Sequence, residues 1–109
     1  MKYLDAMKTV TNFDQSIMLT EKGEPANIKD IIMQYAIQFT SENGDYKAIM
    51  RTRKIAEKLF NHKIDKLELE DAEFDLVREM LKKGIGQQKF HHPDIIMAQV
   101  YEAMEQAES

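Results

Sequence analysis

Apolar residues recur at steps of three and four in four stretches of the chain, and this pattern predicts four helices. The clearest stretch is 46–60, which carries an apolar face and, on another side, a cationic one. Asp45 directly precedes it and is well placed as an N-cap. We expect the apolar face to pack against the rest of the chain. Its members are Ala48, Ile49, Thr52, Ile55, Ala56, Leu59 and Phe60.

A second helix is predicted over 28–40. Asn27 is its expected N-cap, and Asp30 stands three residues later in the first turn. The short link 41–45 favours an antiparallel arrangement of this helix and the helix over 46–60.

Two further helices are expected over 70–83 and 93–106. The first begins with acidic residues and ends with lysines, which suits the helix dipole. Gly84 and Gly86 follow it, so we expect the helix to end there and the stretch 84–92 to form a mobile loop.

Short strands are predicted before and between the helices. Lys8–Phe13 and Ser16–Thr20 contain β-branched and apolar residues on either side of a turn-like stretch, which indicates a small hairpin. Leu67 and Leu69 alternate with charged residues, which is compatible with a third short strand.

The predicted fold is therefore a mainly α, single compact domain over 1–109, with a hairpin or extended segment over 1–26 and a helical core over 27–109. A chain of 109 residues with 43% apolar and 31% charged residues is typical of one globular domain. It contains no Cys, which excludes disulfides and Cys-based zinc sites. No stretch approaches the roughly 20 apolar residues of a membrane span. We expect a cytoplasmic protein.

Charge alternates along the chain, although its net value is only −4. Residues 46–63 carry +5 and residues 64–80 carry −5. One interpretation is that successive segments lie side by side and neutralise one another. Another is that the cationic face of 46–60 meets a partner. The cationic residues of this helix are Lys47, Arg51, Arg53, Lys54 and Lys58.

Three environments are compatible with this cationic stripe. It could be solvated or paired with the acidic helix over 70–83, it could bind an acidic protein, or it could lie along nucleic-acid phosphates. The acidic total charge argues against a general nucleic-acid binder. Residues 52–59, TRKIAEKL, resemble the first helix of a helix-turn-helix motif, which implies DNA binding. However, Phe60 and Asn61 stand where a glycine turn is expected, and the following helix begins too late for the motif.

Large apolar residues beyond one buried stripe are a second feature of the helices over 28–40 and 93–106. Met and Tyr are enriched at protein interfaces, so these residues predict self-association or another protein contact. The alternative is that they fill the core of the monomer. They are Met33, Tyr35, Ile37, Met97, Tyr101 and Met104.

No catalytic or metal-binding pattern occurs in the sequence. The histidines His62, His91 and His92 lack the spacing of a zinc site, and the acidic cluster over 68–75 lacks that of a calcium loop. We therefore expect a non-enzymatic protein without a cofactor, a metal or a small-molecule substrate.

The overall layout resembles small uncharacterised helical proteins of bacteriophage and prophage genomes. The matching parts are 28–30 (IKD), 51–59, the LELE step at 67–70, and 97–104. The resemblance implies a compact helical domain and a phage accessory or assembly role, in the host cytoplasm. Taken together, the sequence predicts a protein–protein interaction module that self-associates, and the alternative is a nucleic-acid-binding regulator that uses the basic face of 46–60.

Overall fold

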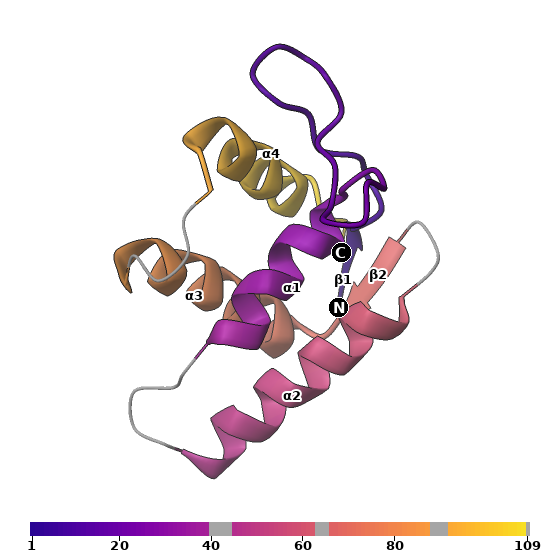
Figure 1. The fold of residues 1–109 in the computed structure, drawn as a ribbon. Coiled ribbons are helices and arrows are strands. Elements are labelled where there is room, and N and C mark those ends of the chain that lie inside the picture. The colour runs from indigo at the N-terminus through magenta and orange to yellow at the C-terminus, as the bar shows by residue number, and fades with distance from the viewer. Residues whose placement is uncertain (40–44, 63–65, 88–91, 109) are drawn as a thin grey trace.

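The computed structural model describes residues 1–39, 45–62, 66–87 and 92–108, and Figure 1 shows their arrangement. Four helices surround a common core beside a small antiparallel sheet. This confirms the predicted mainly α fold. The elements are β1 (Lys2–Asp5), α1 (Ile28–Gln38), α2 (Tyr46–Asn61), β2 (Lys66–Leu69), α3 (Asp71–Gln87) and α4 (Asp94–Glu105).

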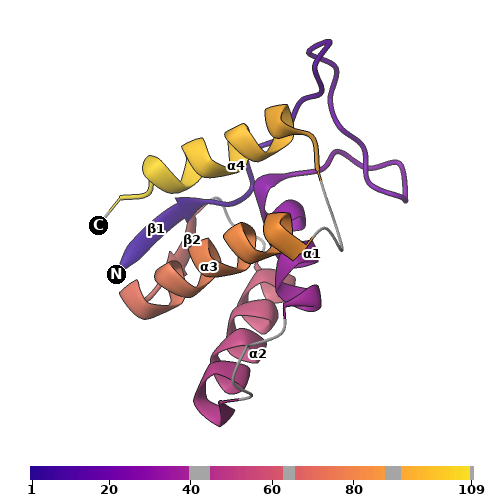
Figure 2. The same ribbon diagram turned by 90° about the vertical axis from the view of Figure 1, so that its left-hand side faces the viewer.

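Helix α1 lies at the centre and packs against α2, α3 and α4 (Figures 1 and 2). Its start is fixed by the predicted cap, because the Asn27 side chain accepts from the Asp30 N–H at 3.0 Å. The Asp30 carboxylate in turn accepts from the Asn27 N–H at 3.1 Å, which completes a capping box. Its buried residues are Ile28, Ile31, Ile32, Tyr35 and Ala36.

Strand β1 pairs antiparallel with β2, with Lys2 opposite Leu69 and Asp5 opposite Lys66. The strand predicted around Leu67 and Leu69 is thus confirmed, whereas β1 was not predicted. The other edge of β1 is also occupied, since Tyr3 exchanges two backbone hydrogen bonds with Glu108, of 2.7 and 3.1 Å.

The segment 11–25, here called the arm, extends from the body as two small loops (Figures 1 and 2). A bridge between Thr11 and Ile17 closes the first loop, so the chain reversal predicted between 8–13 and 16–20 is confirmed, although as an isolated bridge and not as two strands. A bridge between Leu19 and Pro25 closes the second loop. That loop turns at Gly23, whose φ of 80° is costly for other residues.

The base of the arm is a three-way backbone junction. Val10 donates its N–H to the carbonyl of Ala26 at 3.0 Å, Ala26 to Met18 at 2.8 Å, and Met18 to Val10 at 3.0 Å. These three residues are the inner ends of the two loops, and each satisfies its N–H in a place where no regular sheet forms. The junction therefore fixes where both loops leave the body.

Helix α3 runs through Gly84 and Gly86 to Gln87, so the predicted end at residue 83 was wrong. A glycine costs a helix only about 1 kcal/mol, which does not by itself end a helix that packs on a neighbour, as α3 packs on α1. The predicted loop over 84–92 is thus helical over its first four residues, and residues 88–91 lie outside the described part of the chain.

Candidate interaction surface on helix α2

Helix α2 joins the core through its second half. Ile55 and Leu59 are fully buried, and Ala56 is half-buried. Ile49 and Phe60, which were predicted to belong to the same buried stripe, are exposed, and this part of the prediction was wrong. For Ile49 the reason is the size of the neighbour: α1 has 11 residues against 16 in α2, so α1 does not cover the first turns of α2. Phe60 is exposed because it lies about 100° around the helix from the buried Leu59.

The first turns of α2 therefore extend past the body, as Figures 1 and 2 both show. Three large apolar side chains on these turns, Tyr46, Ile49 and Met50, are between 42% and 74% exposed. They are interspersed with cations. The α2 surface, as we name it, comprises Tyr46, Lys47, Ile49, Met50, Arg51, Arg53 and Lys54.

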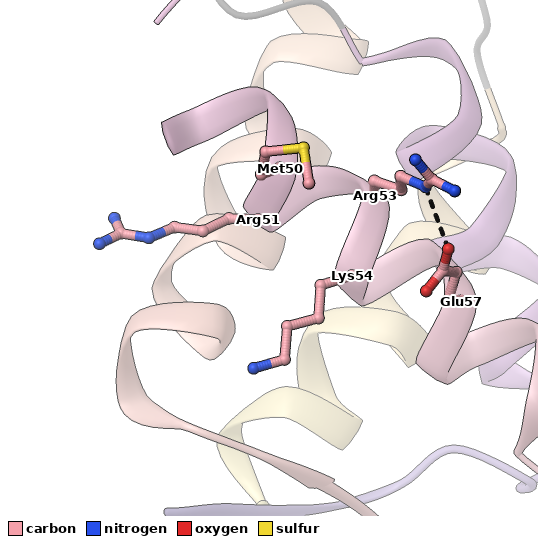
Figure 3. Close-up of a pocket in the computed structure, with 5 residues that line it drawn as sticks. All are labelled: Met50, Arg51, Arg53, Lys54 and Glu57. Carbon is pink, nitrogen blue, oxygen red and sulfur yellow. Dashed lines mark hydrogen bonds and ion pairs between the residues drawn. The ribbon is translucent and has the colours of Figure 1, made fainter. Parts of the chain in front are cut away.

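A hollow of about 460 Å³ lies on this surface, with Met50 in its lining (Figure 3). Arg51, Arg53 and Lys54 surround it, and Figure 3 shows their side chains pointing in different directions. Because the three cations diverge, they do not converge on one small anion. They instead spread positive charge around Met50, which suits an extended partner, although Glu57, which pairs with Arg53, also lines the hollow.

Two of the five cations predicted for a partner contact are already paired. Arg53 binds Glu57 one turn further along α2, at 3.1 Å, in an exposed pair that contributes little to stability. Lys58 binds Glu73 of α3 at 2.6 Å. The hypothesis that the stripe is neutralised by the acidic third helix thus holds at Lys58.

The other three cations, Lys47, Arg51 and Lys54, are exposed and form no ion pair with any of the residues that the structure describes. They follow one another at steps of four and three, so they lie on the same flank of α2. This flank keeps its positive charge available to a partner.

Glu73 is a buried carboxylate that the sequence did not predict, since a first-turn acidic residue was expected in water. Burial raises its pKa, but the hydrogen bonds from Lys58 and from the Glu70 N–H, with the charges of Lys58 and Lys54, outweigh burial and hold the pKa below its usual 4.5. The contact with the Glu70 N–H, at 2.9 Å, is half of a capping box. The spacing of Glu70 and Glu73 is the signal that could have revealed it.

The six apolar residues predicted for an interface differ in how deeply they are buried. Tyr35, Met97 and Met104 lie in the core, which was the stated alternative, and the Tyr35 hydroxyl lies 3.3 Å from the Met97 sulfur. Met33 and Tyr101 are half-buried against the core. Ile37, in the last turn of α1, is exposed, and of the six it alone stands free of the core.

Two of the histidines have structural roles in the described chain. His62 caps the end of α2, and its carbonyl accepts from Lys29 at 3.0 Å. His92 contacts the Gln34 side chain at 2.8 Å, and His91 lies outside the described residues. Across the parts of the chain that are described, no three His, Asp or Glu side chains gather as a metal site would require.

The chain matches no protein-family model, no curated protein and no solved structure. Within the described segments, none of the helices combines the length and the apolar character needed to cross a membrane. The α2 surface is thus the feature of this molecule on which a functional proposal can be built.

Proposed function

We propose that this chain is a non-enzymatic protein-interaction module that binds an acidic, partly apolar segment of a protein partner through the α2 surface. One observation carries the proposal: exposed apolar side chains and unpaired cations alternate on the half of α2 that lies outside the core. The resemblance to phage proteins extends the proposal to an accessory or assembly role in a host cytoplasm.

The apolar part of the surface would supply most of the affinity. Tyr46, Ile49 and Met50 keep large apolar areas in water. Full burial of such a side chain contributes about 1.5–3 kcal/mol, so covering the exposed part of each one would contribute roughly 1–2 kcal/mol to binding. Tyr, Met and Arg are the residue types enriched at the centre of protein interfaces. Exposed apolar residues that gather on one element mark interaction sites more often than isolated ones do.

The cations would select the partner. Lys47, Arg51 and Lys54 attract an acidic segment and repel a basic one, which affects the association rate and specificity more than the final affinity. The same charges oppose a symmetric pairing of α2 with α2 of a second copy, because the helix carries five cations and one acidic residue between Tyr46 and Asn61. An acidic partner is therefore favoured over a second α2.

Nucleic acid is the second candidate, and one observation favours it. The unpaired flank formed by Lys47, Arg51 and Lys54 could follow a phosphate backbone without any apolar contact. The net charge of −4 opposes this candidate, and it assigns no role to Ile49 or Met50. The two candidates therefore differ in which side chains they require.

The test is fluorescence anisotropy with two labelled probes, an amphipathic peptide of Glu, Leu and Ala and a DNA duplex. We expect the peptide to bind, and binding to be lost both in Ile49→Ser/Met50→Ser and in Lys47→Glu/Arg51→Glu. Lys66→Glu, an exposed cation on β2, is the charge control and should bind as the wild type does. Ile49 and Met50 are exposed, so their replacement should leave the fold intact.

The same experiment can overturn the proposal. Duplex binding that falls steeply with salt and is unchanged in Ile49→Ser/Met50→Ser would establish the nucleic-acid candidate instead. Absence of binding to both probes would leave the α2 surface as a solvated face.

A further inference from the structure

The arm, at the other end of the molecule, has the opposite character to the α2 surface. Phe13, Ile17 and Leu19 are between 52% and 85% exposed, the highest value being that of Phe13 at the tip of the first loop. The charged residues over 12–25 are mostly acidic. They are Asp14, Glu21 and Glu24, with Lys22 as the one cation.

The arm is held at its base and within its first loop. Its base is the junction of Val10, Met18 and Ala26, and the Gln99 side chain of α4 binds both backbone groups of Thr11, at 2.9 and 2.8 Å. Within the first loop, Asp14 accepts hydrogen bonds from the N–H and hydroxyl of Ser16. A segment fixed in this way loses little further freedom when a partner covers it, which favours binding.

We propose that the arm of one copy of this chain binds the α2 surface of a second copy, so that the protein associates head to tail. The inference rests on the proposed function and names its partner. Acidic residues would face the cations, as Asp14 and Glu24 would face the flank of Arg51 and Lys54. The apolar side chains of the arm would cover those of α2, and both sets are exposed in a single copy.

The placement of the two surfaces excludes the same contact within one copy. In Figures 1 and 2 the arm and the first turns of α2 point away from the body at opposite ends, and the longest dimension of the chain is 41 Å. Contact between unlike surfaces is heterologous, so an open assembly of any size retains one free arm at one end and one free α2 surface at the other. The assembly therefore grows with concentration unless it closes into a ring.

The molecule has enough surface for two such contacts. A stable interface buries roughly 800 Å² on each partner. Two of them would occupy less than a quarter of the 7137 Å² of accessible surface that the chain exposes.

A mixing experiment with the full chain separates this arrangement from a symmetric one. Phe13→Ser/Ile17→Ser removes the apolar part of the arm and leaves α2 intact. Ile49→Ser/Met50→Ser does the reverse. Light scattering should give masses above the 12.7 kDa of one chain for the wild type at high concentration, and about 12.7 kDa for each variant alone. An equimolar mixture of the two variants should form dimers and nothing larger, because one intact interface is restored.

Controls and salt make the outcome specific. Phe60→Ser removes a more exposed apolar side chain near the other end of α2 and should associate as the wild type does, whereas Ile49→Ser/Met50→Ser should weaken association at least about tenfold. Raising the salt concentration should weaken the wild-type assembly, since the contact pairs opposite charges. Circular dichroism shows whether each variant is folded.

Each alternative result overturns the inference in a different way. If the mixture stays at the mass of the monomer, or if the arm variant still associates alone, the contact is not between arm and α2. If the wild type stays monomeric at every concentration while the Glu-, Leu- and Ala-containing peptide binds α2, the inference fails and the proposed function stands. If the peptide also fails to bind, both fail.

Discussion

Lys58 on α2 and Glu73 on α3 hold each other directly, with 2.6 Å between the ammonium nitrogen and one carboxylate oxygen. The Glu73 side chain is 5% exposed and that of Lys58 is 31% exposed, so the pair is largely shielded from water. It divides the cationic stripe of α2 into a structural end at Lys58 and a free end at Lys47, Arg51 and Lys54. The free end belongs to the α2 surface, whereas the structural end joins α2 to α3.

Replacing Lys58 by Met should destabilise the fold by about 1–3 kcal/mol, because the buried Glu73 carboxylate would lose its counter-ion. Lys47→Met is the matched control on the same helix, and its exposed site predicts a change within about 0.5 kcal/mol. Urea unfolding of both variants measures the difference. Equal stability of the two would mean that the Lys58–Glu73 pair contributes nothing.

The stability should also depend on pH through Glu73. Its pKa in the folded chain is lowered, so the stabilisation is complete above the pKa of this carboxyl in the unfolded chain, about 4.5, and is lost as the pH falls through the lower folded value. Gln at this position keeps a hydrogen-bond acceptor but cannot titrate. The free energy of unfolding of the wild type should therefore exceed that of Glu73→Gln most at neutral pH, and the gap should narrow in acid.

A gap between these two proteins that is constant from pH 7 to strongly acidic solution would contradict the assigned pKa. The comparison is made by urea unfolding at each pH. Other carboxylates titrate in both proteins, so their contributions cancel in the difference.

Two isoleucines of α2 should respond very differently to truncation. Ile55→Ala should cost about 2–4 kcal/mol, because it opens a cavity where the side chain is fully buried. Ile49→Ala should change the free energy of unfolding by less than about 0.5 kcal/mol, because half of that side chain is in water. Similar losses at both sites, in thermal or urea unfolding, would show that Ile49 also belongs to the core.

This contrast shows where the sequence was informative about α2 and where it was not. Periodicity placed both isoleucines on one face, and the caps at Asn27 and Asp45 were readable because capping depends on residues three or fewer positions away. Whether the apolar face of a helix is buried along its whole length depends on the length of the helix that packs against it. The shortness of α1, which leaves Ile49 in water, is set by its end after Gln38 and not by any residue of α2.

The other failures have the same cause. Strand β1 finds its partner β2 more than 60 residues later in the chain, so its four residues carry too little pattern of their own. Glu73 is buried because Lys58 of another helix reaches it. The cations Lys47, Arg51 and Lys54 were predicted as candidates from their positions, but their separation from Lys58 required the packing of α2 on α3.

The clamp between Gln99 and Thr11 should control the mobility of the arm. Gln99→Leu removes both side-chain hydrogen bonds to the Thr11 backbone and should speed hydrogen exchange of the amides over 10–18 while leaving α1 unchanged. Gln106→Leu, at the C-cap of the same helix, is the control, since the Gln106 side chain contacts only Glu102 among the side-chain bonds that the structure describes. Unchanged exchange in the arm would show that the junction at its base holds it without Gln99.

The most direct test of the α2 surface is an NMR titration of the isotope-labelled protein with the peptide of Glu, Leu and Ala. The proposed function predicts that backbone amide shifts move over 46–57 and stay fixed over α3 and β2. Movement spread over α3 and β2, or none over 46–57 at saturating peptide, would contradict the claim that α2 is the protein-binding surface.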